Sequence, residues 1–248
     1  MADKTSIEWT ETTWNPVTGC DRTSPGCDHC YAQRLAKRLK FMGVERYQAD
    51  GDPRTSGPGF GVTCHYDLIE LPHRWRTPRL VFVNSMSDLF HPAVPNEFVE
   101  SVFTTMQSCD RHTFQVLTKR SKRLKQLSRR LPWPRNVWMG VSVESARYRF
   151  RIDDLRKVPA KVRFLSIEPL IAAVDELDLD GIHWVIVGGE SGPAARPIDP
   201  GWVTDIRDQC IDAGVAFFFK QWGGRTPKAG GRELEGVMWD EMPAEVAV

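Results

Sequence analysis

Short apolar runs alternate along most of the chain with polar stretches that carry helical periodicity. The apolar runs predict buried strands at 80–84, 113–117, 137–141, 162–165, 184–187 and 215–219. Continuous apolar runs of this length are typical of parallel strands that are covered on both faces. Helices are expected near 95–108, 121–130, 145–156 and 201–213, with a short helical turn after the strand that ends at 165. The chain is therefore predicted to be a series of βα units.

A further unit and a long irregular segment precede these runs. Residues 15–19 are interpreted as a first strand with its exit turn, and residues 27–41 as an amphipathic helix. The helix has one apolar stripe and basic residues on its other faces; the stripe consists of Tyr31, Leu35 and Leu39, and the basic residues are Arg34, Lys37, Arg38 and Lys40. Residues 43–79 are rich in Gly, Pro, Asp and Arg, which predicts a long functional insertion with little regular structure.

Six or seven βα units indicate an α/β protein with a partial or irregular (βα) TIM-type barrel rather than a complete barrel of eight units. An open doubly wound sheet is the alternative fold. We expect residues 1–225 to form the partial barrel, with the insertion at about 43–79, and residues 226–248 to form a C-terminal tail. The length of 248 residues is usual for a single α/β barrel.

Each predicted strand is followed directly by polar residues. Barrel enzymes place their active sites at the carboxyl ends of the strands, so these residues are expected to line one mouth. Two pairs of polar residues alternate about a single apolar residue, which points both members of a pair in the same direction. The clusters are Cys20; Ser85, Ser87 and Asp88; Thr118 and Lys119; the pair Ser142 and Glu144; the pair Ser166 and Glu168; Gly188, Gly189, Glu190 and Ser191; and Lys220 and Gln221.

Three of these clusters also have a purely structural interpretation. Asp88 is suited to capping the helix or turn that follows it. Pro169 fixes the exit of its strand and makes a structural role for Ser166 and Glu168 an alternative. Glycine pairs are frequent turn residues, so Gly188-Gly189 is either a tight turn or a close approach of the backbone to a ligand.

Three of the six cysteines, Cys20, Cys27 and Cys30, fall within eleven residues on a predicted loop between a strand and a helix. Thiolates are soft ligands that suit zinc, copper(I) and iron–sulfur clusters. One interpretation is a four-iron cluster with one iron left open for a chelating molecule. The other is zinc, with His29, Cys64 or His65 as the fourth ligand. Cys109 and Cys210 are expected to be small buried residues, and the role of Cys64 stays open.

Composition and apolar patterning indicate the class of protein and its compartment. The net charge of +1 gives no overall field that would favour nucleic acid, and no stretch approaches 18 apolar residues, so no membrane span is expected. The N-terminus lacks an apolar signal core. Clustered cysteines without such a signal favour a cytoplasmic protein with free thiols over a disulfide framework.

A basic run accompanies the predicted helix at 121–130. Lys119 ends a strand and is expected to neutralise a carboxylate or phosphate at the mouth; Lys220 has a similar position. The rest of the run is interpreted first as a solvated helix face, and a track for a nucleic-acid backbone is the alternative. The run contains Arg120, Lys122, Arg123, Lys125, Arg129 and Arg130.

Parallel βα units with three cysteines after the first strand resemble the radical S-adenosylmethionine superfamily. More closely, the chain resembles over about residues 5–225 the phage-associated family named for its three-cysteine motif, which is a family of unknown function. The runs that carry this resemblance are TTWNPVTGC, SPGCDHCYA, VFVNSMSDLFH, FQVLTKR, VWMGVSVE, RFLSIEPL, WVIVGGESG and FFFKQWG.

The resemblance implies a metal site with a 4Fe-4S cluster on Cys20, Cys27 and Cys30, and S-adenosyl-L-methionine held by the polar strand ends. Such an enzyme forms a 5′-deoxyadenosyl radical that abstracts hydrogen from a substrate over the barrel mouth. The implied cofactor-binding residues are Ser85, Ser87, Asp88, Ser142, Glu144, Ser166, Glu168, Gly188, Gly189 and Glu190.

The implied partners are a reductase or flavodoxin-type electron donor and a substrate that the resemblance does not identify. A distant resemblance to radical lesion-repair enzymes of the spore photoproduct lyase type makes DNA or RNA one candidate substrate. The insertion at 43–79 and the segment after Gly223 are expected to cover the mouth. The competing hypothesis is a zinc-binding three-cysteine interaction module without catalysis.

Overall fold

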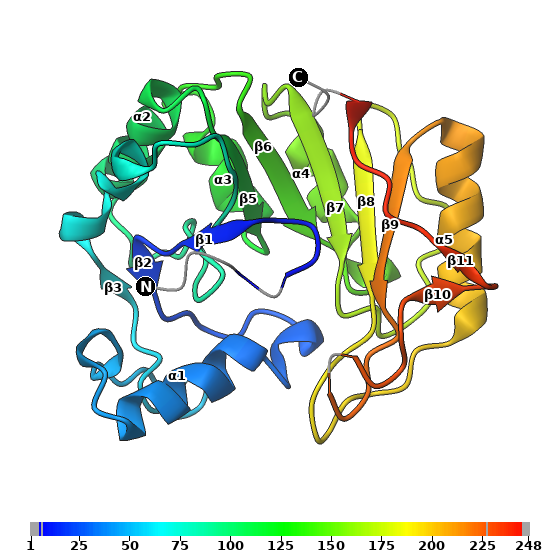
Figure 1. The fold of residues 1–248 in the computed structure, drawn as a ribbon, viewed down its shortest axis with the longest axis horizontal. Coiled ribbons are helices and arrows are strands. Elements are labelled where there is room, and N and C mark those ends of the chain that lie inside the picture. Colours follow the sequence, from blue (N-terminus) through cyan, green and yellow to red (C-terminus); the bar gives the residue numbers. More distant parts are fainter. Residues whose placement is uncertain (1–4, 6, 227, 245–248) are drawn as a thin grey trace.

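The computed structural model describes residues 5, 7–226 and 228–244. Seven strands form one sheet in the order β1-β4-β5-β6-β7-β8-β9, and every neighbouring pair is parallel. Their bounds are β1 Thr12–Trp14, β4 Leu80–Val83, β5 Thr113–Thr118, β6 Val137–Ser142, β7 Val162–Ile167, β8 Trp184–Gly188 and β9 Ala216–Gln221. The spatial order follows the chain order, as expected for successive βα units. β1 and β9 form the two edges, so the sheet does not close into a complete barrel. It is curled into a half-barrel (Figure 1). The predicted partial α/β barrel is confirmed.

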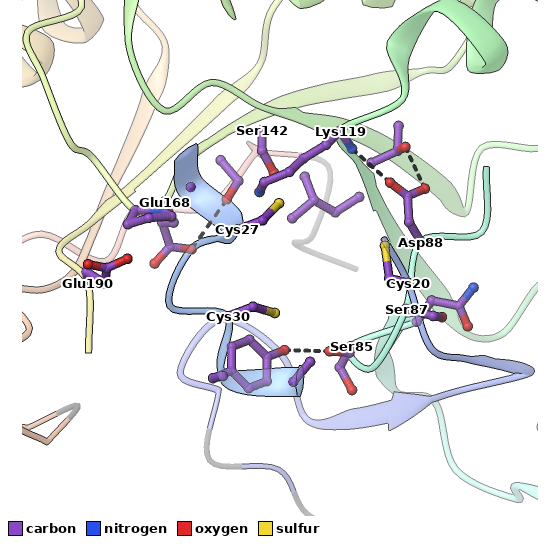
Figure 2. Close-up of a pocket in the computed structure, with 18 of the residues that line it drawn as sticks. Cys20, Cys27, Cys30, Ser85, Ser87, Asp88, Lys119, Ser142, Glu168 and Glu190 are labelled. Atoms are coloured by element: carbon purple, nitrogen blue, oxygen red, sulfur yellow. Dashed lines mark hydrogen bonds between the residues drawn. The ribbon is translucent and has the colours of Figure 1, made fainter. Parts of the chain in front are cut away.

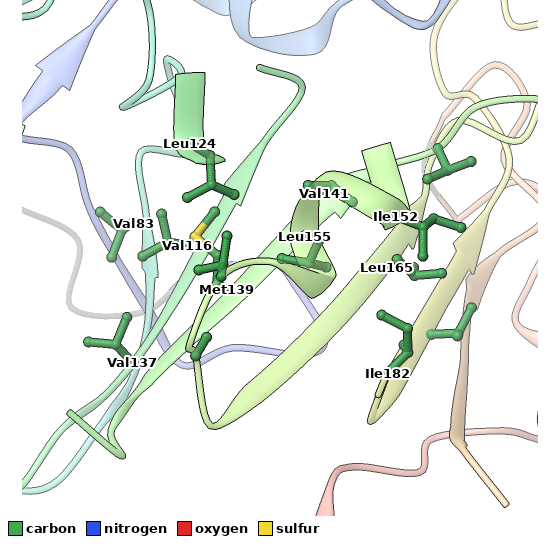
Figure 3. Close-up of a cluster of buried hydrophobic side chains, with 14 of the residues drawn as sticks. Val83, Val116, Leu124, Val137, Met139, Val141, Ile152, Leu155, Leu165 and Ile182 are labelled. Carbon is green, nitrogen blue, oxygen red and sulfur yellow. The ribbon is translucent and has the colours of Figure 1, made fainter. Parts of the chain in front are cut away.

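Helices cover the convex face of the sheet. The helices are α2 (Asn96–Ser108) after β4, α3 (Ser121–Leu127) after β5, α4 (Phe150–Arg156) after β6 and α5 (Pro200–Ala213) after β8. Their apolar side chains pack on those of the strands in one large core, in which Val116 and Met139 of the sheet lie near Leu124 of α3 and Leu155 of α4 (Figure 3). Side chains that point to the convex face are therefore buried by helices, and those that point to the concave face are covered by the aromatic cluster described next. Burial on both faces explains why the strands are apolar at consecutive positions.

Aromatic side chains fill the lower part of the concave face. Trp9, from the segment before β1, has its ring centroid 4.7 Å from that of Phe82 on β4 and 6.1 Å from that of Trp184 on β8. These two strands are separated by three others in the sheet, so one side chain can contact both only because the sheet is curled. These side chains fill the interior of the half-barrel below the carboxyl ends of the strands. The interior is therefore open at the carboxyl ends.

The first strand differs from the prediction. The strand of the main sheet is Thr12–Trp14, whereas the predicted segment 15–19 contributes β2 (Val17–Thr18), which pairs antiparallel with β3 (Thr63–Cys64). Pro16 separates the two strands, and proline cannot donate a ladder hydrogen bond. The helical turn expected after residue 165 is also absent, because residues 168–183 contain no helix.

The amphipathic helix exists as α1 (Tyr31–Phe41), which begins four residues later than predicted; a short 3₁₀ helix (Pro25–Cys27) precedes it. Its buried residues are Ala32 and Ala36, while Tyr31 and Leu35 of the predicted apolar stripe are 49% and 40% exposed. The helix lies at the open end of the sheet instead of packing on a broad face, so only two small side chains are needed on its inner side (Figure 1).

The insertion has little regular structure, as predicted. Within 43–79 it contains β3 and three 3₁₀ helices, Glu45–Tyr47, Tyr66–Leu68 and Leu71–Arg74. The C-terminal segment forms a hairpin of β10 (Glu233–Leu234) and β11 (Val237–Met238) and then lies along β9, where Phe219 N donates to Trp239 O over 2.9 Å. Within the described residues, no helix has the length and apolar character to span a membrane.

Candidate functional site

A cavity of about 250 Å³ lies at the open end of the half-barrel, beneath α1 and the cysteine loop. Its wall contains all three clustered cysteines, Cys20, Cys27 and Cys30. It also contains most of the other residues that the strand-end pattern predicts, among them Ser85, Ser87, Asp88, Ser142, Ser166, Glu168, Gly189 and Glu190. Lys119 and Lys220 also line it, while Trp9 and Phe82 form part of its apolar floor. Residues far apart in the sequence therefore meet in one place, as expected for the carboxyl ends of parallel strands.

The three cysteines lie around this cavity on different sides (Figure 2). Cys20 follows the β2 strand, Cys27 ends the 3₁₀ helix and Cys30 precedes α1. None is in a disulfide. Among the described residues, no three His, Cys, Asp or Glu side chains converge closely enough to hold one metal ion.

The close packing before Cys20 depends on a glycine. Gly19 has a φ of +84°, and a Cβ on it would lie 2.1 Å from the carbonyl oxygen of Gly61 in the insertion. Only glycine suits both conditions. Cys20 N then donates to Phe60 O over 3.3 Å, so the insertion holds the cysteine loop from outside.

Six polar contacts hold the cysteine loop against the insertion and the segments that follow the strands. Asp21 accepts hydrogen bonds from Thr55 Oγ1 and Ser56 Oγ and pairs with His91 Nε2 at 2.9 Å. The other three contacts are Arg120 Nη2 donating to Asp21 O, Ser24 Oγ donating to Glu144 Oε1, and Arg196 Nη2 donating to Pro25 O, over 3.1, 2.6 and 2.8 Å. The loop is thus tied to the ends of β5, β6 and β8.

The three thiols differ in acidity. Burial and the nearby Asp88 raise the pKa of Cys20 to about 12, although Arg120 acts in the opposite direction. Burial also raises the pKa of Cys30. For Cys27, burial is outweighed by the ammonium of Lys119 and by hydrogen bonds from Thr23 and Ser24, so its pKa is lowered. Metal ligation by these thiols would release protons.

Asp88 lines the cavity, but its carboxylate is occupied by protein groups. Oδ1 accepts from Thr118 Oγ1 over 2.7 Å and from Phe90 N over 3.0 Å, and Oδ2 accepts from Lys119 N and pairs with Arg120 over 3.1 and 3.2 Å. The capping role considered for this residue is therefore present, since the carboxylate holds the turn after β4 and the exit of β5 together.

Glu144 does not line the cavity, contrary to the expected direction of its side chain. Its side chain is 0% exposed, and its carboxylate pairs with Lys119 at 3.3 Å and with Arg151 at 2.9 Å. Burial opposes its ionisation, but Lys119 and Arg151 together lower its pKa. The strict alternation assumed for Ser142 and Glu144 fails because β6 ends at Ser142, so Glu144 is already in the following turn.

Glu168 and Glu190 have different surroundings. Glu168 Oε1 lies 3.2 Å from Lys220 Nζ, and a Cβ on Gly188 would lie 2.5 Å from the same oxygen. Gly188 is outside the cavity wall and gives Glu168 the space it occupies. Glu190 is bonded to Arg196, whose Nε and Nη2 donate to its two oxygens over 3.0 and 2.7 Å. Gly189 lines the cavity and closely approaches Trp222 O.

The four serines keep their predicted place. Ser142 and Ser166 lie opposite each other on β6 and β7 and line the cavity. Ser85 Oγ donates to Asn15 Oδ1 over 3.2 Å, and Ser87 Oγ donates to Val17 O over 2.8 Å. Ser166 Oγ donates to Glu168 Oε2 over a long 3.5 Å. Ser142 is therefore better placed than Ser85 or Ser87 to offer its hydroxyl to a bound molecule.

Most of the basic run at 119–130 is engaged within the protein. Lys119 pairs with a carboxylate, but that carboxylate is the buried Glu144 and not a group in the cavity wall. Arg123 donates to the carbonyl oxygens of His91 and Val94, Lys125 pairs with Asp154, and Arg130 pairs with Glu100 at 2.7 Å. Lys122 lies over the ring of Phe150.

The candidate fourth zinc ligands are placed differently from one another. His29 lines the cavity, whereas Cys64 is opposite Val17 in the β2–β3 ladder and His65 Nε2 lies 2.8 Å from Thr18 Oγ1. Cys109 and Cys210 are buried, as predicted.

Sequence reasoning missed Arg196, Arg151 and Asp21 as supports of the site. Arg196 and Arg151 belong to segments with no local motif, and only the three-dimensional arrangement brings them to the cysteine loop and Glu144. Asp21 carried one signal, its position directly after Cys20.

A family model described as "Protein of unknown function (DUF5131)" matches residues 4–243. A search of curated proteins finds no match. Among solved structures, a variant of spore photoproduct lyase with bound AdoMet and dinucleoside spore photoproduct is similar, with 12% sequence identity and a TM-score of 0.43. The similarity covers 79% of this chain and 60% of that protein, so this chain spans less than two thirds of its length.

Proposed function

The chain belongs to the DUF5131 family, and we propose that it is a radical S-adenosylmethionine-type enzyme with a 4Fe-4S cluster on Cys20, Cys27 and Cys30. The observation that carries this proposal is the position of three free thiols around one cavity at the carboxyl ends of a parallel half-barrel. Thiolates are the usual ligands of iron–sulfur clusters. The proposed reaction is hydrogen abstraction from a substrate. The electron that reduces the cluster beforehand would come from a reductase or flavodoxin-type donor.

The donor set and its surroundings fit such a group. Of the described cysteines, the cavity wall contains Cys20, Cys27 and Cys30, and three thiol ligands would leave one position of a four-iron cluster for a chelating molecule. A bound cluster with S-adenosylmethionine supplies radical chemistry. Lys119 and Arg120 place two cations beside Cys27 and Cys20, where they offset the negative charge of thiolates.

Residues of this chain would then bind the polar parts of S-adenosylmethionine. Ser142 and Ser166 offer hydroxyl donors and acceptors on adjacent strands, and Glu168 with Lys220 offers a carboxylate and an ammonium. Gly189 allows close approach of the backbone. Asp88, Glu144 and Glu190 would act indirectly, because their carboxylates hold Arg120, Lys119 and Arg196.

Anaerobic reconstitution followed by iron and sulfide analysis tests the proposal. We expect a brown protein with about four irons and four sulfides per chain. Alanine at any one of Cys20, Cys27 or Cys30 is expected to abolish retention, while Cys109→Ala and Cys210→Ala serve as controls that retain it. Stoichiometric zinc and no visible absorbance in the wild-type protein would instead support the non-catalytic zinc module.

A further inference from the structure

One face of α1 exposes apolar and basic side chains together. Positions three and four apart on a helix share a face. The α1 stripe, as we call it, consists of Tyr31, Arg34, Leu35, Arg38, Phe41 and Met42. Its apolar members are unusually open for large side chains, since Phe41 is 76% and Met42 is 64% exposed. Contiguous exposed apolar surface of this kind marks interaction sites.

The stripe begins at the cavity. Tyr31 lines the cavity wall, and its hydroxyl donates to Ser85 O over 2.6 Å. Arg34 Nη2 donates to the carbonyl oxygen of Ser191, which also lines the wall, over 2.8 Å. The whole of α1 is about 16 Å long, at 1.5 Å per residue. A molecule lying along the stripe would have one end at the cavity.

The charge of α1 is entirely positive. The helix contains no acidic residue, and no carboxylate of the described part of the chain pairs with Arg34, Lys37 or Arg38. These cations contrast with those of α3, where Lys125 is paired with Asp154. A surface for phosphates is therefore better placed on α1 than on the basic run at 119–130.

We propose that the α1 stripe binds single-stranded nucleic acid and leads it to the cavity. Aromatic rings interleaved with cations are the pattern that proteins use for single strands, because every base can stack and every phosphate is negative. Tyr31 and Phe41 supply the rings, and Arg34 and Arg38 supply the charges. The inference deepens the proposed function, on which it rests, by naming the substrate class of that cavity.

Binding by the cluster-free protein tests this inference separately from cluster loading. The probe is a fluorescein-labelled 20-nucleotide oligo(dT), followed by fluorescence anisotropy over a series of salt concentrations. We expect salt-sensitive binding, stronger than to a 20-base-pair duplex. Arg38→Glu should weaken binding at low salt about tenfold and flatten the salt dependence, because one phosphate contact is lost. Phe41→Ala should weaken it about tenfold at every salt concentration, because one stacking partner is lost.

A matched charge control is the single reversal Arg135→Glu, since Arg135 is exposed and lies far along the chain from α1. This variant should bind oligo(dT) like the wild type. Absence of binding at low salt, equal affinity in Arg38→Glu, or preference for the duplex would overturn the inference. So would equal or tighter binding of polyglutamate of matched charge, which would indicate an acidic protein partner. Iron and sulfide content, measured on separate samples, decides the proposed function independently of these outcomes.

Discussion

The guanidinium of Arg120 lies with Nη1 3.4 Å from Cys20 Sγ. The same Nη1 is 3.2 Å from Oδ2 of Asp88, and Nη2 donates to the carbonyl oxygen of Asp21. Burial lowers the pKa of Arg120, but Asp88 and Cys20 outweigh it, so its pKa is raised and it stays charged. One side chain at the exit of β5 thus orients a proposed cluster ligand and the residue after it.

Replacing Arg120 should separate charge from shape. Arg120→Ala leaves the carboxylate of Asp88 buried without its cation and is expected to lower the free energy of unfolding by about 3–5 kcal/mol, measured by urea denaturation. Arg120→Lys keeps a charge for Asp88 but lacks the planar fork needed to reach Asp21 O and Cys20 together. It should therefore retain more stability yet bind less iron after reconstitution. Iron content equal to wild type in both variants would contradict this role for Arg120.

Glu144 should matter for stability rather than for cofactor contact. Glu144→Gln leaves Lys119 and Arg151 with an uncharged partner in a fully buried position, so we expect a loss of about 3 kcal/mol or more in the free energy of unfolding. The exposed Glu97 is the matched control, and Glu97→Gln should change stability by less than about 0.5 kcal/mol. Thermal or urea unfolding measures both. A change in Glu144→Gln as small as the control's would argue against a structural role for this carboxylate.

The same carboxylate predicts a pH dependence. Its pKa in the folded protein is lowered from the ordinary value of 4.5, so folding favours the ionised form. The resulting stability is present above the unfolded value and is lost as pH falls through the folded value. Urea unfolding between about pH 6 and pH 3 should show a smaller loss of stability in Glu144→Gln than in the wild type. If the free energy of unfolding had the same dependence on pH in the two proteins, Glu144 would be excluded as a source of that dependence.

The strands and their polar ends could be predicted because both follow from local pattern. Consecutive apolar residues record burial on two faces, and the carboxyl end of each run predicted where polar side chains meet, as Ser142 and Ser166 show. What each carboxylate does there could not be predicted. Glu144 and Glu168 have the same spacing from a serine, yet one is buried against Lys119 and the other lines the cavity. That difference depends on Ser24, Arg151 and Gly188, whose contacts no local pattern records.

The face of α1 was also beyond local pattern. Helical spacing predicted a stripe that includes Tyr31 and Leu35, but periodicity does not say whether anything covers it. In the structure the helix crosses an open end and buries Ala32 and Ala36 instead. Nucleic-acid binding, which the sequence suggested as an alternative role for the basic run at 119–130, stays a proposal. We now propose it for α1 instead of that run.

Arg196 is expected to restrain the cysteine loop. It donates to Pro25 O from the loop after β8 and is held by both oxygens of Glu190. Arg196→Met keeps a long side chain but removes these bonds, so amides near Cys27 should exchange with deuterium faster, by about tenfold for a lost charge-assisted hydrogen bond. Arg225→Met, at an exposed position, is the control and should leave that exchange unchanged. Equal protection in both variants would show that the loop is held without Arg196.

Gly188 and Glu168 should be coupled in cofactor binding. A Cβ on Gly188 would lie 2.5 Å from Glu168 Oε1, and the end of a glutamate side chain can move, so Gly188→Ala is expected to displace the carboxylate from Lys220 rather than unfold the protein. The affinity of the reconstituted protein for S-adenosylmethionine, measured by calorimetry, should fall about tenfold as a buried polar partner is lost. Glu168→Ala should lower the affinity for S-adenosylmethionine by a similar factor.

The double variant decides whether the two effects are one. If Gly188→Ala acts only by moving Glu168, then adding it to Glu168→Ala should change the affinity no further, because the side chain that it displaces is already gone. Additive losses would mean that Gly188 contributes to the cofactor site through its own backbone. Gly201→Ala is the control for a crowded glycine outside the cavity wall, since its Cβ would lie 3.2 Å from Asp199 Oδ1, and it should leave the affinity unchanged.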